Sequence, residues 1–408
     1  TVAGATYSTS AIDKIYLKAT IFANIYQGFE SRPFNILDDY SANFGLRTSL
    51  AYDFENSKKS KVQFGFEISK EEYNYDLYRT EDGIQGEQFQ QNEELRSSTQ
   101  FFAQYNMNFL DDLELEVGLN ANLTSYTLDD QFASDMTDIS GEYNYSWIYS
   151  PRLNLKYTLN ESDHLYGLIS HGYSIPTLEE TLTPDGLINN DIKPEIGLNT
   201  EIGFRGMTNN EKWSYGLTAY QMLVKNLLVA RRTAADQFIG VNAGGSRHIG
   251  AELDLAYKMF NSGDWRSDFN LAYTYQKFTF TDFVDGEEDY SSNELTGAIP
   301  NQVALGWTGG YKRLSLIIKY KYIDSMPMRD DNSIYSDAYS LLDIYTTKTI
   351  AIGVFDIGMS AGVNNVLDTD YASMILVNAG SFGGNAPRYF YPGLPINAFG
   401  RMSIRYNF

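Results

Sequence analysis

Strict alternation of polar and apolar residues recurs over long stretches of this chain. From 113 to 124 every odd position is apolar, whereas Glu114 and Glu116 occupy even positions. Successive side chains of a β-strand point to opposite faces, so this segment predicts a strand with one apolar and one polar face. Charged side chains are costly in lipid, so we expect the two glutamates to face a wet interior.

The same alternation appears in segments 195–205, 251–257, 355–364 and 399–408. Alternating stretches of roughly ten residues match the length that a tilted strand needs to cross a bilayer, whereas strands of soluble proteins are typically about 5 to 6 residues long. The sequence contains no apolar run long enough for a transmembrane helix. The pattern therefore predicts an all-β fold, a transmembrane antiparallel up-and-down β-barrel.

Short and long connections alternate along the chain, which is typical of short periplasmic turns and long outer loops. We expect the long loops near 28–39, 79–92, 128–141, 175–193, 229–241, 283–298, 324–337 and 367–397. We predict about sixteen spanning strands between Lys14 and Phe408, at roughly 25 residues for each strand with its connection. Residues 1–12 are interpreted as a lead-in or the end of a preceding strand, and residues 13–408 as barrel. Sixteen strands can close as a porin or belong to a larger barrel. Closure is required because an open edge leaves backbone groups unpaired in hydrocarbon.

The chain of 408 residues has 52 acidic and 31 basic residues and a formal net charge of -21. This balance argues against nucleic-acid binding, which needs clustered Lys and Arg. We assign the acidity to solvated loops and the barrel interior. Zero Cys is compatible with an oxidising periplasm without reliance on disulfides.

Catalysis has little support, and we assign no enzyme activity, cofactor or metal. The sequence contains three His residues. Ser170 and His171 are adjacent, so on one strand they point to opposite faces and cannot form a nucleophile and base.

Several motifs occur in a recognisable order. HGYSIPTLEE at 171–180 is followed by IKPE at 192–195, and the later segments are Tyr220 with VKNLL at 224–228, NAGGSRHIGAE at 242–252, IPNQ at 299–302, NNVLD at 364–368 and RYFYPG at 388–393. This ordered set resembles TonB-dependent outer-membrane receptors, in which a Pro-x-x-x-Glu segment precedes a loop and a Leu-Lys-Pro-Glu box opens the next strand. The resemblance covers roughly the second half of the chain.

The resemblance implies active uptake of a scarce nutrient, most often an iron-siderophore complex or related metal chelate, across the outer membrane of a Gram-negative bacterium. Family barrels have 22 strands around an N-terminal plug, on which the inner-membrane TonB complex pulls. We therefore interpret the chain as the C-terminal portion of such a barrel, without plug domain. The expected partners are the plug, the TonB complex, the barrel-assembly machinery, lipopolysaccharide and the chelate. The terminal strand, with Tyr406 and Phe408, resembles the family's assembly signal.

Candidate ligand residues lie in the expected outer loops. Arg231 and Arg232 could hold an anionic chelate through their guanidinium groups, although lipopolysaccharide contact or a loop ion pair is favoured. A second set could stack on an aromatic ligand, although packing at the interface or within the loop is favoured. This set is Met374, Phe382, Arg388, Tyr389, Phe390 and Tyr391.

Other loop residues have weaker indications of metal binding. The acidic segments DGEED at 285–289 and Asp330 to Asn332 could bind Ca²⁺, but solvated loops are favoured because neither has EF-hand spacing. Met326 and Met328 could ligate a soft metal, with loop packing favoured. Residues expected to face the interior, and a plug where one is present, are Glu114, Glu116, Glu195, Glu201, Arg205, Arg401 and Arg405.

Three functions remain open at this point. The first is a TonB-dependent importer. The second is a self-contained sixteen-stranded passive porin, which usually needs a constriction loop carrying facing acidic and basic clusters, and no loop of this sequence has them. The third is a structural or adhesive barrel whose long loops bind a partner surface.

Overall fold

A computed structural model describes most of the chain. The described residues are 1–10, 12–32, 35–54, 58–81, 83–132, 138–181, 188–189, 191–234, 237–242, 244–285, 287–381 and 386–407. Within these ranges, the side chains of residues 81, 178–179, 230–234, 237–239 and 285 are not described.

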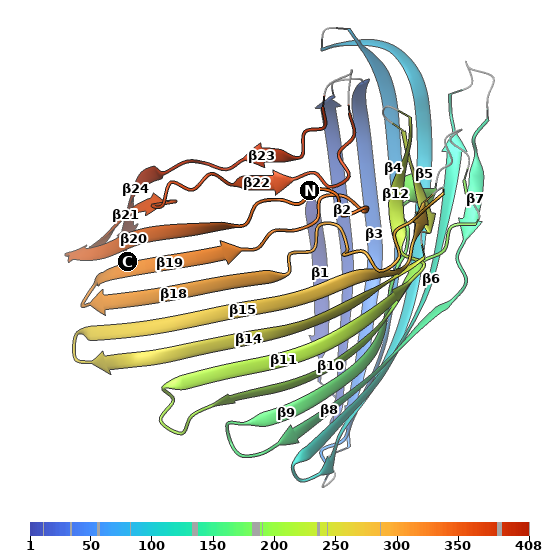
Figure 1. Ribbon diagram of the computed structural model, residues 1–408. Helices are drawn as coiled ribbons and strands as arrows, with labels where there is room; N and C mark the ends of the chain where they lie inside the picture. Colours follow the sequence, from blue (N-terminus) through green and yellow to red (C-terminus); the bar gives the residue numbers. More distant parts are fainter. Residues whose placement is uncertain are drawn as a thin grey trace. The chain divides into compact units, whose positions relative to one another are not determined.

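The described residues form long β-strands (Figure 1) and a short helix. The strands of the first half are β1 (Val2–Thr9), β2 (Ile15–Ser31), β3 (Asn35–Asp53), β4 (Lys61–Glu81), β5 (Ile84–Leu110), β6 (Leu113–Asp130), β7 (Gly141–Asn144), β8 (Ile148–Thr158) and β9 (His164–Ser174). The helix is α1 (Leu178–Thr181). The following strands are β10 (Glu195–Met207), β11 (Trp213–Lys225), β12 (Leu228–Ala234), β13 (Gln237–Asn242), β14 (Gly245–Ser262), β15 (Trp265–Asp282), β16 (Val284–Asp285), β17 (Glu288–Asp289), β18 (Asn301–Tyr311), β19 (Leu314–Ile323), β20 (Tyr339–Ile352), β21 (Phe355–Asn364), β22 (Ala372–Ile375), β23 (Phe390–Pro392) and β24 (Asn397–Tyr406).

Eighteen of these strands belong to one sheet, and β12–β13, β16–β17 and β22–β23 form separate two-stranded ribbons. Strands that follow one another in the sheet pair antiparallel, from β1–β2 through β5–β6 and from β11–β14 through β21–β24. Of the eighteen strands, β1 lies before residue 14. Strands β7 and β8 both pair with β6 and together count as one spanning strand. Sixteen spanning strands therefore lie between residue 14 and the C-terminus of the described chain. The predicted fold class and strand number are confirmed.

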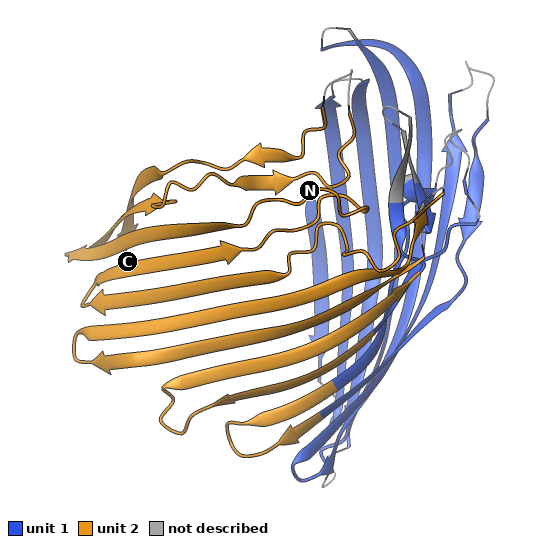
Figure 2. Ribbon diagram, in the orientation of Figure 1, with its two compact units in different colours: residues 1–155, 168–198, 226–242 blue, residues 156–167, 199–225, 243–408 orange. Residues whose placement is uncertain are grey.

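The chain divides into two compact units (Figure 2). Unit 1 contains residues 1–155, 168–198 and 226–242, and unit 2 contains residues 156–167, 199–225 and 243–408. Among the described residues, no helix is both long enough and apolar enough to cross a membrane.

In unit 1 the register aligns polar side chains in rows across the strands. Thr20 pairs with Arg47, Arg47 pairs with Glu67, and Glu67 pairs with Gln100. The opposite face carries apolar side chains such as Phe101, which is 49% exposed. Apolar side chains exposed on one whole face of a sheet are what a lipid-facing wall requires.

In unit 2 the same separation holds. Thr218 on β11 pairs with Glu252 on β14, which pairs with Thr274 on β15. The alternate row joins Leu217, Leu253 and Tyr273. Each strand therefore presents one polar and one apolar face, as the alternation in its sequence predicts.

Two predicted outer loops are strands instead. The segments 28–39 and 79–92 were expected to be long loops, but β2 continues to Ser31, β4 continues to Glu81 and β5 begins at Ile84. Polar and apolar residues do not alternate regularly in these segments, so the pattern on which the sequence prediction depends is missing there. An antiparallel ladder continues in water without an apolar face, because its backbone hydrogen bonds do not require one.

Aromatic rings lie on glycines of the polar face. In unit 2 the Tyr166 ring covers Gly203, where an added Cβ would be 2.3 Å from the ring. The Tyr166 hydroxyl donates to Glu201 Oε1 at 2.6 Å and lies 2.9 Å from Thr218 Oγ1. Glycine is therefore required at 203, because the hydrogen bonds hold the ring against the backbone.

We expect Gly203→Ala to lower the free energy of unfolding by about 1–3 kcal/mol, since the new Cβ displaces a ring held by two hydrogen bonds. Thermal unfolding in detergent, followed by the heat-dependent electrophoretic mobility of the barrel, measures this. The matched control is Gly172→Ala, where no heavy atom lies within 4 Å of the added Cβ. Equal midpoints for the two variants would contradict the assignment.

Candidate ligand site on the polar face of unit 1

The strands of unit 1 extend beyond their apolar band. On β4 the apolar face carries Phe64, Phe66 and Ile68, and then continues with Lys70 and Glu72. On β6 the apolar band from 113 to 123 is followed by hydroxyl and carboxylate side chains at 125, 127 and 129. The far ends of these strands therefore lie outside the hydrocarbon, on the side away from the β3–β4 connection.

Three neighbouring strands bring polar side chains together beyond this band. Glu71 on β4 pairs in register with Arg96 on β5, which pairs with Tyr126 on β6. These three side chains line a cavity of about 140 Å³, together with neighbouring residues of β4 and β5 and the segment that follows β9. Its lining residues are Glu71, Tyr73, Glu94, Arg96, Tyr126 and Thr177.

Tyr126 joins the strand wall to the segment that covers it. Its side chain is 4% exposed, and its hydroxyl donates a hydrogen bond of 2.9 Å to the carbonyl oxygen of Pro176. The Arg96 guanidinium lies 5.5 Å from the Tyr126 ring centroid, within cation-π distance. The Arg96 charge is thereby held at the cavity wall.

The covering segment is stabilised locally by a capping box. The Thr177 backbone N–H donates to Glu180 Oε2 at 2.7 Å, and the Glu180 N–H donates to Thr177 Oγ1 at 3.3 Å. The sequence Thr-x-x-Glu is the signature of this reciprocal pair, which starts α1. Thr177 is therefore fixed at the edge of the cavity by its own sequence neighbours.

A small aromatic core supports the site. Tyr126, Leu128 and Tyr145 are buried against one another, and the Tyr143 and Tyr145 ring centroids are 4.5 Å apart. The Tyr143 hydroxyl donates to the carbonyl oxygen of Ile192 at 2.8 Å. The outer segments of unit 1 are therefore packed as a structured cover.

The Tyr145 hydroxyl has no hydrogen-bond partner within the described part of the chain, although the side chain is 4% exposed. Burial raises the pKa of the Tyr145 phenol, so it remains protonated at physiological pH. A buried hydroxyl without a partner is costly. The cavity itself is lined by the Arg96 guanidinium and the carboxylates of Glu71 and Glu94, a set of donors and acceptors suited to reversible binding of a polar ligand.

The loop residues that the sequence suggested for ligand binding belong to two different units. Arg231 and Arg232 have their backbone in β12, but their side chains lie outside the described residues, as does Phe382. Met374, Phe390 and Tyr391 share the β22–β23 ribbon of unit 2, where Met374 pairs with Tyr391. Arg388 and Tyr389 come directly before β23, the second strand of this ribbon. Their role in ligand binding stays a prediction.

The residues expected to face the interior have varied partners. Glu116 forms an ion pair of 3.4 Å with Arg152. Glu195 accepts a hydrogen bond of 2.6 Å from the Leu228 N–H and so holds a connecting segment. Arg205 lies 5.4 Å from the Tyr166 ring centroid.

The remaining predicted residues lie on β6, β10 and β24. Glu114 and Glu201 share the polar face of their strands, and Arg401 and Arg405 pair in register with Ser360 and Asp356. Tyr406 pairs with Phe355 at the end of β24, whereas Phe408 lies outside the described residues. Contact with a plug and a role in assembly stay predictions for these residues.

The acidic loop at 330–332 ties the outer loops of unit 2 together. Asp330 accepts hydrogen bonds from the Thr296 hydroxyl and from Asn378 Nδ2, and Asn332 Oδ1 accepts one of 2.7 Å from the Glu294 N–H. The side-chain oxygens of Asp330 and Asn332 therefore hold neighbouring loops together through hydrogen bonds. The described residues contain no group of three or more His, Cys, Asp or Glu that could hold a metal ion. Met328 is buried at 3% exposure, which agrees with loop packing.

Comparison with known families identifies the fold. Residues 2–366 match the family described as "TonB dependent receptor-like, beta-barrel". The chain belongs to this family. The resemblance drawn from the ordered motifs is confirmed, and the protein is an outer-membrane β-barrel of a Gram-negative bacterium. Comparison with curated protein sequences finds no match.

Solved structures of receptors and transporters share the fold. Similar chains include the copper transporter OprC (TM-score 0.76, 16% identity, 98% of this chain and 64% of that chain). The siderophore receptor PiuA from Acinetobacter baumannii has a TM-score of 0.75 and 14% identity over 99% of this chain and 64% of that chain. The ferric citrate transporter FecA in its unliganded form has a TM-score of 0.77 and 13% identity over 99% of this chain and 60% of that chain. This receptor barrel thus spans less than two thirds of each, and none of the three is described as an enzyme.

Sequence reasoning missed the cavity residues of unit 1. Thr177 lies in the motif at 171–180, but no motif marks the cavity residues on β4, β5 and β6. The strands β4 and β5, of 21 and 27 residues, are longer than a bilayer needs, so their ends lie outside it, and this length became visible only in the structure.

We expect Tyr126→Phe to loosen the covering segment, because it removes the hydrogen bond to Pro176, which is worth about 1 kcal/mol. Faster amide hydrogen exchange in a peptide containing residues 175–181 is the predicted result. Tyr215→Phe, which removes a 2.7 Å hydrogen bond to Asp163 in unit 2, is the control and leaves that peptide unchanged. Unchanged exchange in Tyr126→Phe would show that the bond does not hold the segment.

Proposed function

We propose that the receptor barrel is part of a TonB-dependent active importer of a scarce nutrient, with an iron-siderophore or related metal chelate as the ligand. The observation that carries the proposal is the polar cavity beyond the apolar band, in a barrel of the receptor family. The names of the similar structures, a copper transporter, a siderophore receptor and a ferric citrate transporter, support this ligand class.

Active import needs a polypeptide that couples the barrel to an energy source. The proposed partners are therefore an N-terminal plug and the TonB complex acting through it, with residues 13–408 of this receptor supplying barrel wall and outer loops. The barrel-assembly machinery and lipopolysaccharide are further proposed partners, the first through the strand that contains Tyr406. A passive porin is disfavoured by the family match.

Uptake by iron-limited cells tests the proposal. Cells expressing the full-length receptor are given ⁵⁵Fe as ferric citrate, a ferric trihydroxamate or a ferric tricatecholate. We expect accumulation of at least one chelate that is abolished by a protonophore. Uptake of none, or uptake that persists with the protonophore, would overturn active import.

The Arg96→Gln variant tests the cavity itself. We expect the concentration for half-maximal uptake to rise about tenfold, since one charge-assisted contact is worth about 1.5–3 kcal/mol. Lys258→Gln is the matched control, because Lys258 forms an exposed pair of 3.9 Å with Glu211 in unit 2. Equal effects in the two variants would remove Arg96 from the site.

A further inference from the structure

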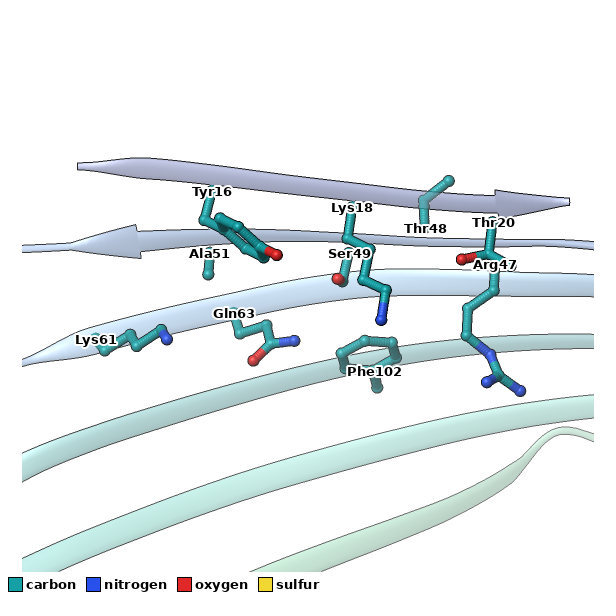
Figure 3. Close-up of a pocket in the computed structure, with 10 residues that line it drawn as sticks. All are labelled: Tyr16, Lys18, Thr20, Arg47, Thr48, Ser49, Ala51, Lys61, Gln63 and Phe102. Carbon is teal, nitrogen blue, oxygen red and sulfur yellow. The ribbon is translucent and has the colours of Figure 1, made fainter. Parts of the chain in front are cut away.

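A second cavity lies on the polar face of unit 1, near the β3–β4 connection (Figure 3). Its volume is about 400 Å³. Its wall comes from β2, β3, β4 and β5 (Figure 3). The side chains that give it its charge and shape are Lys18, Arg47, Ser49, Lys61, Gln63 and Phe102. Thr48, on the opposite face of β3, points away from them in the same view.

The strand register explains why the wall is hollow here. Lys18 on β2 pairs with Ser49 on β3, Ser49 pairs with Gly65 on β4, and Gly65 pairs with Phe102 on β5. Two small residues therefore separate a long cation from an aromatic ring. The Phe102 ring leans over Gly65, where an added Cβ would be 2.4 Å from the ring. The result is a depression with an aromatic side.

The charge of this cavity opposes that of the chain. Its lining contains three cationic side chains and no carboxylate, in a chain of net charge -21. Arg47 is paired with Glu67. Among the described residues, Lys18 and Lys61 have no ion pair, although Asp53 stands opposite Lys61 in the strand register. Two ammonium groups are therefore available to an anion.

Two other cavities of this protein have a different charge composition, because each contains at least one carboxylate. The cavity of about 300 Å³ in unit 2 also contains two lysines, Lys319 and Lys321, but Asp343 pairs in register with Lys319 and balances its charge. The outer cavity of unit 1 carries Glu71 and Glu94 beside Arg96. The basic cavity is the one of these three whose lining has cations alone.

We propose that the basic cavity binds an organic anion, a carboxylate or phosphate carried on an apolar or aromatic frame. The ammonium groups of Lys18 and Lys61 contact the anion, and Gln63 and Ser49 supply further hydrogen-bond donors. Phe102 packs against the frame. Both lysines are exposed to solvent, so binding is weak and falls as salt rises. The proposal does not depend on import.

The anion has two possible sources. One is a free solute in the barrel interior, and the other is an Asp or Glu side chain of a polypeptide lying against this wall. Both present the same carboxylate chemistry, so the experiment has one arm for each source.

The first arm uses ¹⁹F NMR of the full-length receptor in nanodiscs with 4-fluorobenzoate and 4-fluorophenyl phosphate, and 4-fluorobenzyl alcohol as the neutral probe. We expect the anions to bind, the alcohol not to bind, and Lys18→Gln/Lys61→Gln to weaken anion binding about tenfold. Lys18→Arg/Lys61→Arg restores binding, which excludes a folding defect. Lys319→Gln/Lys321→Gln in unit 2 is the matched control and leaves it unchanged.

The second arm treats native outer membranes with a water-soluble carbodiimide, which joins a carboxylate directly to an amine. Cross-links from Lys18 or Lys61 to Asp or Glu of a polypeptide, mapped by mass spectrometry, assign the anion to a side chain. Charge-dependent probe binding without such cross-links assigns it to a solute. Absence of both, or equal probe binding by wild type and the Gln double variant without cross-links, overturns the proposal.

Discussion

Hydrogen bonding of the backbone in a medium without water is the constraint on which this structure depends. Strands with a neighbour on both sides, such as β3, β4 and β5, satisfy their N–H and C=O groups on these antiparallel neighbours, which is the solution that hydrocarbon permits for strands. The ladder leaves side chains free to differ between the two faces. One face is therefore apolar towards lipid, and the other is polar and available for function.

The ladder does not stop where the apolar band stops. Strands β4 and β5 continue into water, where both faces are polar and the pairing is maintained by the backbone alone. There the outer segments of unit 1 pack on Tyr126 and Tyr145 as a small core. A packed cover over a polar cavity reduces the conformational entropy lost when a ligand binds, which agrees with the ligand-binding role that we propose for this cavity.

Within unit 1 the polar face is electrostatically uneven. The cavity beyond the apolar band carries Glu71 and Glu94 with one arginine, whereas the cavity near the β3–β4 connection is lined by cations alone. Clustering charges of one sign on one part of a wall raises the local concentration of the oppositely charged solute. The two cavities are therefore expected to favour different groups, although they belong to the same strands.

The sequence by itself determined the fold class, the number of spanning strands and the family. Alternation has a period of two only in strands, and the motifs between 171 and 393 keep their order. The cavities were decided by the tertiary structure, because strand register joins residues that no local pattern links. Glu71 meets Arg96 and Tyr126 from three strands, and Lys18 meets Gly65 and Phe102 from three. A shift of one residue in the register of a strand would turn its side chains to the lipid face. The register, which the pairing of the whole sheet sets, therefore decides which side chains line each cavity.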